Sequence, residues 1–375
     1  MNLKIFSFMT VILTTLFFCG CYAEKATNAE VPELVEKKID PVEEKLNSMT
    51  LNEKIGQMIM IGVHGKEIND DINFMLNQYH VGGIIFFDRN MDNKQQVKNF
   101  VDALNVTANE KVPLFIALDE EGGRVARMKH DLTAPPSQES IGAGGNPADA
   151  ETYAKQTADE LNKIGVNINF APVADVGSRD TRSFSDNANT VAEFLDSAAK
   201  GYEEKKFFYC LKHFPGIGRS KVDPHKDISL IDVDKNTLDA EDILPFKKII
   251  ATHDNKNFMV MIGHLKYSAL DTENTASVSK NIVTNLLRDE LNFQGVVITD
   301  DLGMGAVANY DDIETLSVKA VQAGVDIILS CHEYDKQQRA YLSILKAVEN
   351  GEISEERINE SVRRILKMKF ALKRD

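Results

Sequence analysis

Short apolar segments rich in Val, Ile and Phe recur along this chain, and amphipathic stretches of helical period separate them. Apolar runs of this kind are typical of strands buried on both faces, as in a parallel sheet covered by helices. The expected strands are Ile55–Val63, Gly83–Phe87, Leu114–Leu118, Val166–Phe170, Phe207–Leu211, Phe258–Ile262, Val296–Thr299 and Val325–Leu329.

Helical periodicity fills the gaps between these runs and also follows the last one. The expected helices include Gln95–Asn109, Ala148–Ile164, Val191–Lys205, Thr237–Ile250, Asn281–Leu291 and a closing stretch, Ser354–Leu372. Eight strands in alternation with helices predict an α/β fold, a (β/α)8 TIM barrel that forms one catalytic domain over residues 46–375. The alternative is a doubly wound open sheet, for which eight strands would be many.

Polar residues follow five of the expected strands, at the point where each strand ends. These positions are Asp119–Arg124, Asp175, Lys212-His213, Gly263-His264 and Asp300-Asp301. In both folds the carboxyl ends of parallel strands meet at one edge, where ligands bind. We therefore expect these carboxylates and bases to converge in one site.

The first 21 residues are typical of an export signal. Lys4 gives a positive start, and the apolar stretch Phe6–Phe18 is too short for a comfortable membrane span. Phe18-Cys19-Gly20-Cys21 is similar to the end of a bacterial lipoprotein signal, and Cys21, preceded by a small glycine, is the candidate for lipidation rather than Cys19. We expect an exported membrane lipoprotein facing the extracytoplasmic side, or a secreted or periplasmic protein if no lipid is attached.

Residues 22–45 are charged and poor in aromatic residues, with Pro32 and Pro41 as helix breakers, which predicts a tether between the signal and the folded body. Two cysteines remain in that body, Cys210 and Cys331, each within or just after an expected strand. They are expected to be buried thiols and not a disulfide framework.

The charge balance restricts the partners. The chain has 57 acidic against 43 basic residues and a net charge of −14, which disfavours nonspecific binding to nucleic acid or anionic lipid. Its eight histidines form no pair at helical spacing with a carboxylate, and no phosphate-binding or dinucleotide motif is present. We expect neither a metal nor a cofactor.

The segment Lys212–Gly218, followed by Asp223-Pro224-His225, carries the strongest chemical signal. A histidine has an ordinary pKa near neutrality, as an acid/base catalyst needs, and a nearby aspartate can orient its ring and stabilise its charged form. A lone histidine or lysine at a strand end is more often structural. The cluster of four such residues favours catalysis.

The chain resembles glycoside hydrolase family 3, and within it the single-domain β-N-acetylhexosaminidases, from about Leu46 to Lys369. The residues that carry the resemblance are Asp119-Glu120-Glu121-Gly122-Gly123-Arg124-Val125-Ala126-Arg127, Arg182-Ser183-Phe184, the Lys212–His225 segment and Ile298-Thr299-Asp300-Asp301-Leu302-Gly303-Met304. The Lys-His-Phe-Pro-Gly…Asp-x-His pattern is the most specific, because it separates this subgroup from relatives with a glutamate acid/base.

The resemblance implies a retaining mechanism. Asp300 would be the nucleophile that forms a glycosyl-enzyme intermediate, and His225 the general acid/base, paired with Asp223. Asp301 competes with Asp300, because successive side chains near a strand end point in opposite directions and only one is expected to face the barrel axis. The family pattern selects Asp300.

The same resemblance assigns the binding of a terminal N-acetylglucosamine to five polar residues. These are Asp119, Arg127, Arg182, Lys212 and His213, whose side chains can accept from or donate to sugar hydroxyls. Glu120 and Arg124 are expected to be structural, in an internal ion pair, and His264 is expected to lie behind the binding residues.

Two residues depart from the family pattern. Pro224 stands where serine or threonine is usual between the aspartate and the histidine, and Ile217 stands where a histidine or another residue is common. Pro224 fixes its own φ and restricts Asp223, so it is expected to stiffen a loop thought to move in this subgroup.

The expected activity is exo-hydrolysis of β-linked N-acetylglucosamine from muropeptides or chitooligosaccharides. Two alternatives stay open. One is a phosphorylase, since a neutral His225 repels phosphate less than a glutamate would. The other is a catalytically silent lipoprotein that binds glycans, against which the joint presence of Asp300, His225 and Asp223 argues.

Overall fold

The computed structural model describes residues 40–108, 112–177, 180–220 and 229–372. Its main sheet has eight parallel strands. They are β1 (Ile59–Gly62), β2 (Gly83–Ile85), β3 (Phe115–Leu118), β4 (Ile168–Asn169), β5 (Phe208–Phe214), β7 (Phe258–Ile262), β9 (Val296–Thr299) and β10 (Ile328–Ser330). Every residue of these eight strands is buried.

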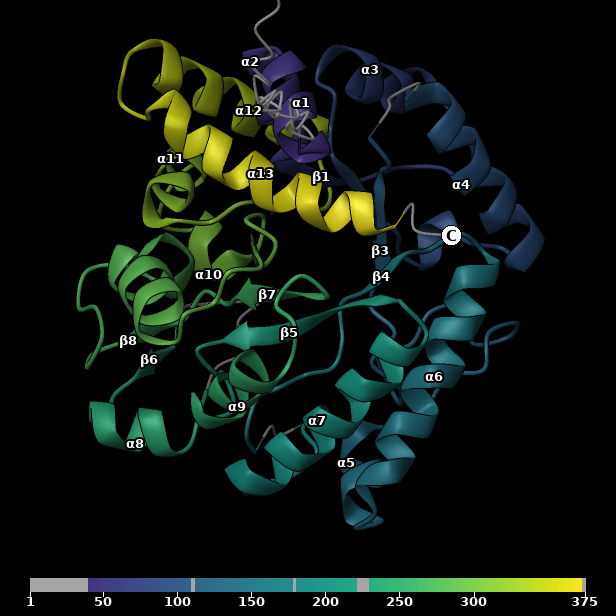
Figure 1. The fold of residues 1–375 in the computed structure, drawn as a ribbon, viewed down its shortest axis with the longest axis vertical. Coiled ribbons are helices and arrows are strands. Elements are labelled where there is room, and N and C mark those ends of the chain that lie inside the picture. Colours follow the sequence, from purple (N-terminus) through teal and green to yellow (C-terminus); the bar gives the residue numbers. More distant parts are fainter. Residues whose placement is uncertain (1–39, 109–111, 178–179, 221–228, 373–375) are drawn as a thin grey trace, which may run out of the picture. The chain divides into compact units, whose positions relative to one another are not determined.

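The strands pair in the order β10-β1-β2-β3-β4-β5-β7-β9. A parallel bridge between Ile298 and Ile327 then joins β9 to the segment that leads into β10, which closes the sheet into a barrel. Strands such as β5 and β7 lie inside a ring of helices (Figure 1). The predicted (β/α)8 TIM barrel is confirmed, and the open sheet is excluded.

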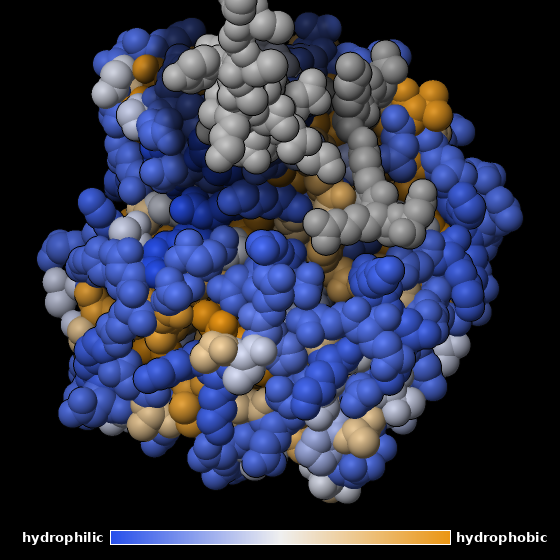
Figure 2. All heavy atoms as spheres, in the orientation of Figure 1, coloured by the Kyte–Doolittle hydropathy of each residue, from blue (hydrophilic) through white to orange (hydrophobic). Residues whose placement is uncertain are grey.

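Long helices cover the barrel, as the periodicity predicts. They are α3 (Asp70–Gln78), α4 (Lys94–Ala108), α6 (Pro147–Lys163), α7 (Ala188–Glu204), the π-helix η3 (Asn281–Glu290), α11 (Ile313–Ala323), α12 (Tyr334–Glu349) and α13 (Glu355–Ala371). On the face shown in Figure 2 hydrophilic side chains predominate, in keeping with the net charge of −14. Among the described residues, no helix is long and apolar enough to cross a membrane.

Two predicted elements differ from the structure. The run from residue 55 to 63 is not one strand, because α2 (Leu51–Gln57) occupies its first part, begun by a capping box of Thr50 and Glu53. The helix predicted over residues 237–250 is two helices, α8 (Lys235–Ala240) and α9 (Leu244–Thr252). Pro245 lies in the first turn of α9, where its missing N–H costs no hydrogen bond.

The predicted boundary at residue 45 is also wrong, because the folded body begins earlier. The helix α1 (Pro41–Ser48) packs on α13, with Val42 and Leu46 buried and Glu43 paired with Arg363. Asp40 caps this helix, and Pro41 occupies its first turn, so the proline starts a helix here and does not break one. Residues 1–39, which include the predicted signal and Cys21, lie outside the described residues.

Candidate active site

A cavity of about 970 Å³ opens where the barrel strands end. Its polar lining comes from segments far apart in the sequence but brought together by β3, β4, β5 and β9. The lining includes Asp119, Glu121, Arg124, Arg127, Asp175, Asp180, Arg182, Lys212, His213, Asp300, Asp301 and His332. All five residues predicted to bind the sugar, and the predicted nucleophile, therefore lie in one cavity.

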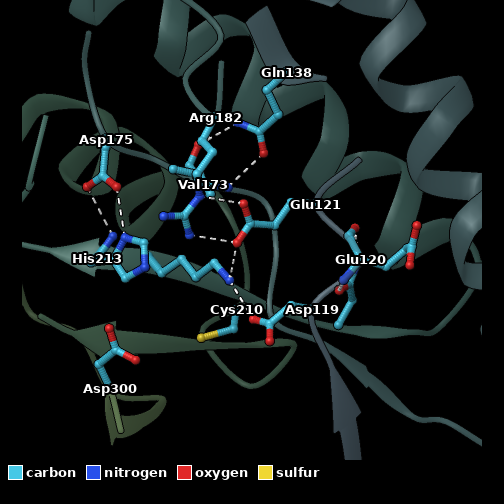
Figure 3. A network of polar contacts seen from close by, with 12 residues as sticks. Asp119, Glu120, Glu121, Gln138, Val173, Asp175, Arg182, Cys210, His213 and Asp300 are labelled. Carbon is cyan, nitrogen blue, oxygen red and sulfur yellow. Dashed lines mark hydrogen bonds and ion pairs between the residues drawn. The ribbon is translucent and has the colours of Figure 1, made fainter. Parts of the chain in front are cut away.

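A buried cluster of charges forms one wall of this cavity (Figure 3). The ammonium group of Lys212, on β5, lies 2.7 Å from Asp119 Oδ1 and 2.6 Å from Glu121 Oε1. The guanidinium of Arg182 meets both oxygens of Glu121, at 2.7 and 2.8 Å. This bidentate geometry holds the cations in fixed positions facing the cavity.

Contacts within the cluster keep Glu121, Lys212 and Arg182 charged. Burial alone would raise the pKa of Glu121, but Lys212 and Arg182 outweigh it and hold that pKa well below its usual range. Burial likewise disfavours the charged forms of Lys212 and Arg182, yet their carboxylate partners raise both pKa values. Fixed charges in a site shielded from water can recognise sugar hydroxyls strongly.

Arg127 reaches the cavity from the loop that follows β3. Its Nη2 donates to Asp119 Oδ2 at 3.1 Å, and Nη1 lies 3.7 Å from Asp88. The ring of Phe87, whose centroid is 5.5 Å from the guanidinium carbon, supports it by a cation–π contact. Asp119 therefore joins Arg127 to Lys212.

Asp175 fixes the orientation of His213. Its Oδ2 lies 2.8 Å from His213 Nδ1, and its Oδ1 accepts from the backbone N–H groups of His213 and Ile217, at 3.1 and 2.9 Å. Both side chains are buried, with relative exposures of 6% and 2%. The imidazole therefore cannot turn freely, and its other nitrogen is left for the cavity.

The neighbouring aspartates on the loop after β9 have different environments. Asp301 accepts from the backbone N–H groups of Gly303 and Cys331, at 3.0 and 3.1 Å, so its carboxylate fixes two loops. Asp300 accepts only a local bond from the Asp301 N–H, at 2.8 Å, among those between described residues. Both residues line the cavity, and Asp300 is the less occupied carboxylate.

The surroundings of Asp300 keep it ionised. Burial would raise its pKa, but His213, His264 and the Asp301 N–H outweigh that effect and lower the pKa. His264 itself lies behind the cavity wall, 2.9 Å from Ser277 Oγ and 3.0 Å from the Asp301 carbonyl, as predicted. A carboxylate held charged in a buried site can act as a nucleophile.

The structure corrects the expected ion pair at Glu120 and Arg124. Arg124 pairs with Asp180 at the rim of the cavity, and both side chains are exposed. Glu120 is buried, and no cation of the described residues lies within ion-pair distance of it. The catalytic pair predicted on residues 221–228, Asp223 and His225 with Pro224 between them, lies outside the described residues.

Glu121, Asp175 and His332 line the cavity but had no assigned role in the sequence analysis. Glu121 and Asp175 carried a signal, because each follows a predicted strand, but only the fold shows that one pairs with Lys212 and the other orients His213. His332 lies 3.5 Å from Asp301, and no sequence signal separates it from an ordinary loop residue.

Comparison with known proteins identifies the family. Residues 50–368 match the glycosyl hydrolase family 3 N terminal domain. The chain belongs to glycoside hydrolase family 3.

Similar sequences are named beta-hexosaminidases, and a solved structure with the same fold is named a beta-N-acetylglucosaminidase. Beta-hexosaminidase A of Pseudoalteromonas piscicida is 33% identical over 80% of this chain, and Beta-hexosaminidase of Haemophilus influenzae is 32% identical over 78% of it. A solved family 3 beta-N-acetylglucosaminidase from Paenibacillus superposes with a TM-score of 0.83 at 36% identity, over 86% of this chain. The matches span 55%, 84% and 62% of those three proteins, so this chain covers little more than half of two of them.

Proposed function

We propose that this protein is an exo-acting, retaining β-N-acetylhexosaminidase that removes terminal β-linked N-acetylglucosamine from muropeptides or chitooligosaccharides. The observation that carries the proposal is the placement of Asp300 in the same cavity as the buried Asp119–Glu121–Arg182–Lys212 cluster. The names of the relatives support the choice of sugar.

The proposed reaction has two steps. The Asp300 carboxylate attacks the anomeric carbon and forms a glycosyl-enzyme bond, while the leaving oxygen takes a proton from His225. Water, deprotonated by His225, then cleaves that bond and releases N-acetylglucosamine. The cluster would hold the sugar through its hydroxyls, and Asp175 would keep His213 aimed at it.

Hydrolysis of p-nitrophenyl N-acetyl-β-glucosaminide in phosphate-free buffer, beside the matching β-glucoside, tests the activity. The chain used lacks residues 1–21. Turnover confined to the acetylated sugar, with the β-anomer as first product, supports the proposal, and activity only on the glucoside contradicts the choice of sugar. A rate that requires added phosphate and yields a sugar 1-phosphate would instead establish the phosphorylase. Silence on both substrates, with and without phosphate, would favour the binding protein.

His225→Ala separates the acid/base step from binding. A p-nitrophenolate needs little protonation to leave, whereas the oxygen of a disaccharide does. We expect the variant to lose about 10²–10⁴-fold on N,N′-diacetylchitobiose and much less in the first step with the p-nitrophenyl substrate. Equal losses on both would contradict the role of His225.

We also propose that the protein is exported and anchored by lipid at Cys21. The support is the sequence alone: the charged start, the short apolar stretch and the small residue before Cys21. In a bacterial host, Cys21→Ser is expected to move the protein from the membrane fraction to the soluble fraction, with Cys19→Ser as the matched control. Equal membrane retention of both variants would contradict lipidation at Cys21.

A further inference from the structure

Glu120 differs from the two acidic residues that flank it. Asp119 and Glu121 take part in the ion-pair cluster, whereas the side chain of Glu120 lies apart from it (Figure 3). Only 4% of Glu120 is exposed. Its carboxyl oxygen Oε2 accepts a hydrogen bond from the backbone N–H of Arg127 at 2.7 Å, which ties together the two ends of the 120–127 loop.

The backbone of Glu120 is anchored to the barrel. The side chain of Asn169, on β4, accepts from the Glu120 N–H and donates to the Glu120 carbonyl, both at 2.9 Å. Asn169 also receives support from Tyr202 of α7, whose hydroxyl lies 2.9 Å from Nδ2. The bond between Glu120 and the Arg127 backbone therefore connects a cavity residue to a strand of the barrel.

Two complementary polar atoms of this pair are buried without a partner among the described residues. One is Glu120 Oε1, and the other is the donor Arg127 Nε. A buried N–H without an acceptor is costly, so Nε gives Arg127 no reason to occupy this position. Other contacts hold it there: the guanidinium donates to Asp119, and the backbone N–H donates to Glu120.

We propose that Glu120 is a positioning residue for substrate binding: its carboxyl, in the neutral form, holds the Arg127 backbone so that the guanidinium faces Asp119 and the cavity. The inference rests on the proposed function, since Arg127 is there a sugar-binding residue. Ionisation of Glu120 would create a buried negative charge next to Arg127, and that charge would compete with the sugar and with Asp119 for the guanidinium.

The surroundings of Glu120 agree with a carboxyl that is mostly neutral below about pH 7. Burial raises the pKa of Glu120 to about 7, and the carboxylate of Asp88 acts in the same direction. The Arg127 amide and guanidinium and the ammonium of Lys129 oppose it. Among the described residues, the buried hydroxyl of Tyr202 also faces Glu120.

A double-mutant cycle tests the inference in the chain lacking residues 1–21. Glu120→Ala is expected to raise KM for p-nitrophenyl N-acetyl-β-glucosaminide about tenfold with little change in kcat, because the loss is one of positioning. In an Arg127→Ala background the same change is expected to have no further effect on KM. Glu139→Ala, on an exposed glutamate of α5 (Gln138–Ala143), is the matched control and is expected to leave KM unchanged.

The isosteric variant supplies the second readout. Glu120→Gln keeps an acceptor for the Arg127 N–H but cannot ionise, so its KM is expected to match the wild type at pH 6. Between pH 6 and pH 8.5 the wild-type KM should rise, and that of the variant should stay flatter.

Each failure has a distinct meaning. Additive effects of Glu120→Ala and Arg127→Ala on KM, or a Glu120→Gln variant as impaired as Glu120→Ala at pH 6, would overturn the positioning role. Parallel KM profiles of the wild type and Glu120→Gln would overturn the requirement for a neutral carboxyl. Absence of turnover in the wild-type protein would instead overturn the proposed function itself.

Discussion

Replacing Asp300 by alanine is expected to lower kcat for p-nitrophenyl N-acetyl-β-glucosaminide by at least about a thousandfold, because the covalent intermediate can no longer form. Among bonds between described residues, the Asp300 side chain accepts only the local N–H of Asp301, so the fold should survive its removal. Steady-state rates, together with the far-ultraviolet circular dichroism of the variant, check both statements.

Azide and Asp289→Ala are the controls for this experiment. Azide can enter the space left by the carboxylate and attack the same face of the sugar, so it should restore part of the rate and yield the α-glycosyl azide. Asp289 is an exposed aspartate on η3, and its replacement should leave the rate unchanged. If Asp300→Ala retained activity and Asp301→Ala, properly folded, did not, the nucleophile would be Asp301.

Replacing Glu121 by alanine is expected to lower the free energy of unfolding by about 3–5 kcal/mol. Glu121 is the only carboxylate among the described residues that forms ion pairs with both Lys212 and Arg182, whose side chains are 3% and 17% exposed. Without it, the Lys212 ammonium keeps only Asp119 as an ion-pair partner among the described residues, and it lies close to the Arg182 guanidinium. Urea denaturation at neutral pH measures the loss.

An exposed ion pair of the same segment provides the comparison. Arg124 and Asp180 are 56% and 40% exposed, so Arg124→Ala should change the free energy of unfolding by less than about 1 kcal/mol. If Glu121→Ala does not fold, Glu121→Gln keeps the shape and removes only the charge, and it should still be destabilised. A loss below that of Arg124→Ala would show that the cluster contributes no stability.

The sequence predicts the barrel well because burial dictates its pattern. Strands enclosed on both faces must be apolar throughout, and β7 and β9 begin and end where the apolar runs do. Boundaries failed where local chemistry replaced that pattern. The capping box at Thr50 starts a helix that extends into an apolar run, and Pro245 lies in the first turn of a second helix inside a continuous helical period.

The composition of the site was also predictable, because strand ends in a barrel converge and carry the polar residues. The partners of those residues were not. Two adjacent aspartates, Asp300 and Asp301, look alike in the sequence, and only the backbone N–H groups of Gly303 and Cys331 distinguish them in the structure. Similarly, nothing in the sequence Asp119-Glu120-Glu121 shows which glutamate forms ion pairs with Lys212 and Arg182.

The sequence by itself determined the barrel, the family and most of the polar residues assigned to the cavity, because hydrophobic periodicity and short motifs act locally along the chain. The tertiary structure alone decided which charges meet: Glu121 with Lys212 and Arg182, Asp175 with His213, and Glu120 with the Arg127 backbone. The physical reason is that ion pairing and burial depend on distances of a few ångströms between residues up to 93 positions apart, as for Asp119 and Lys212.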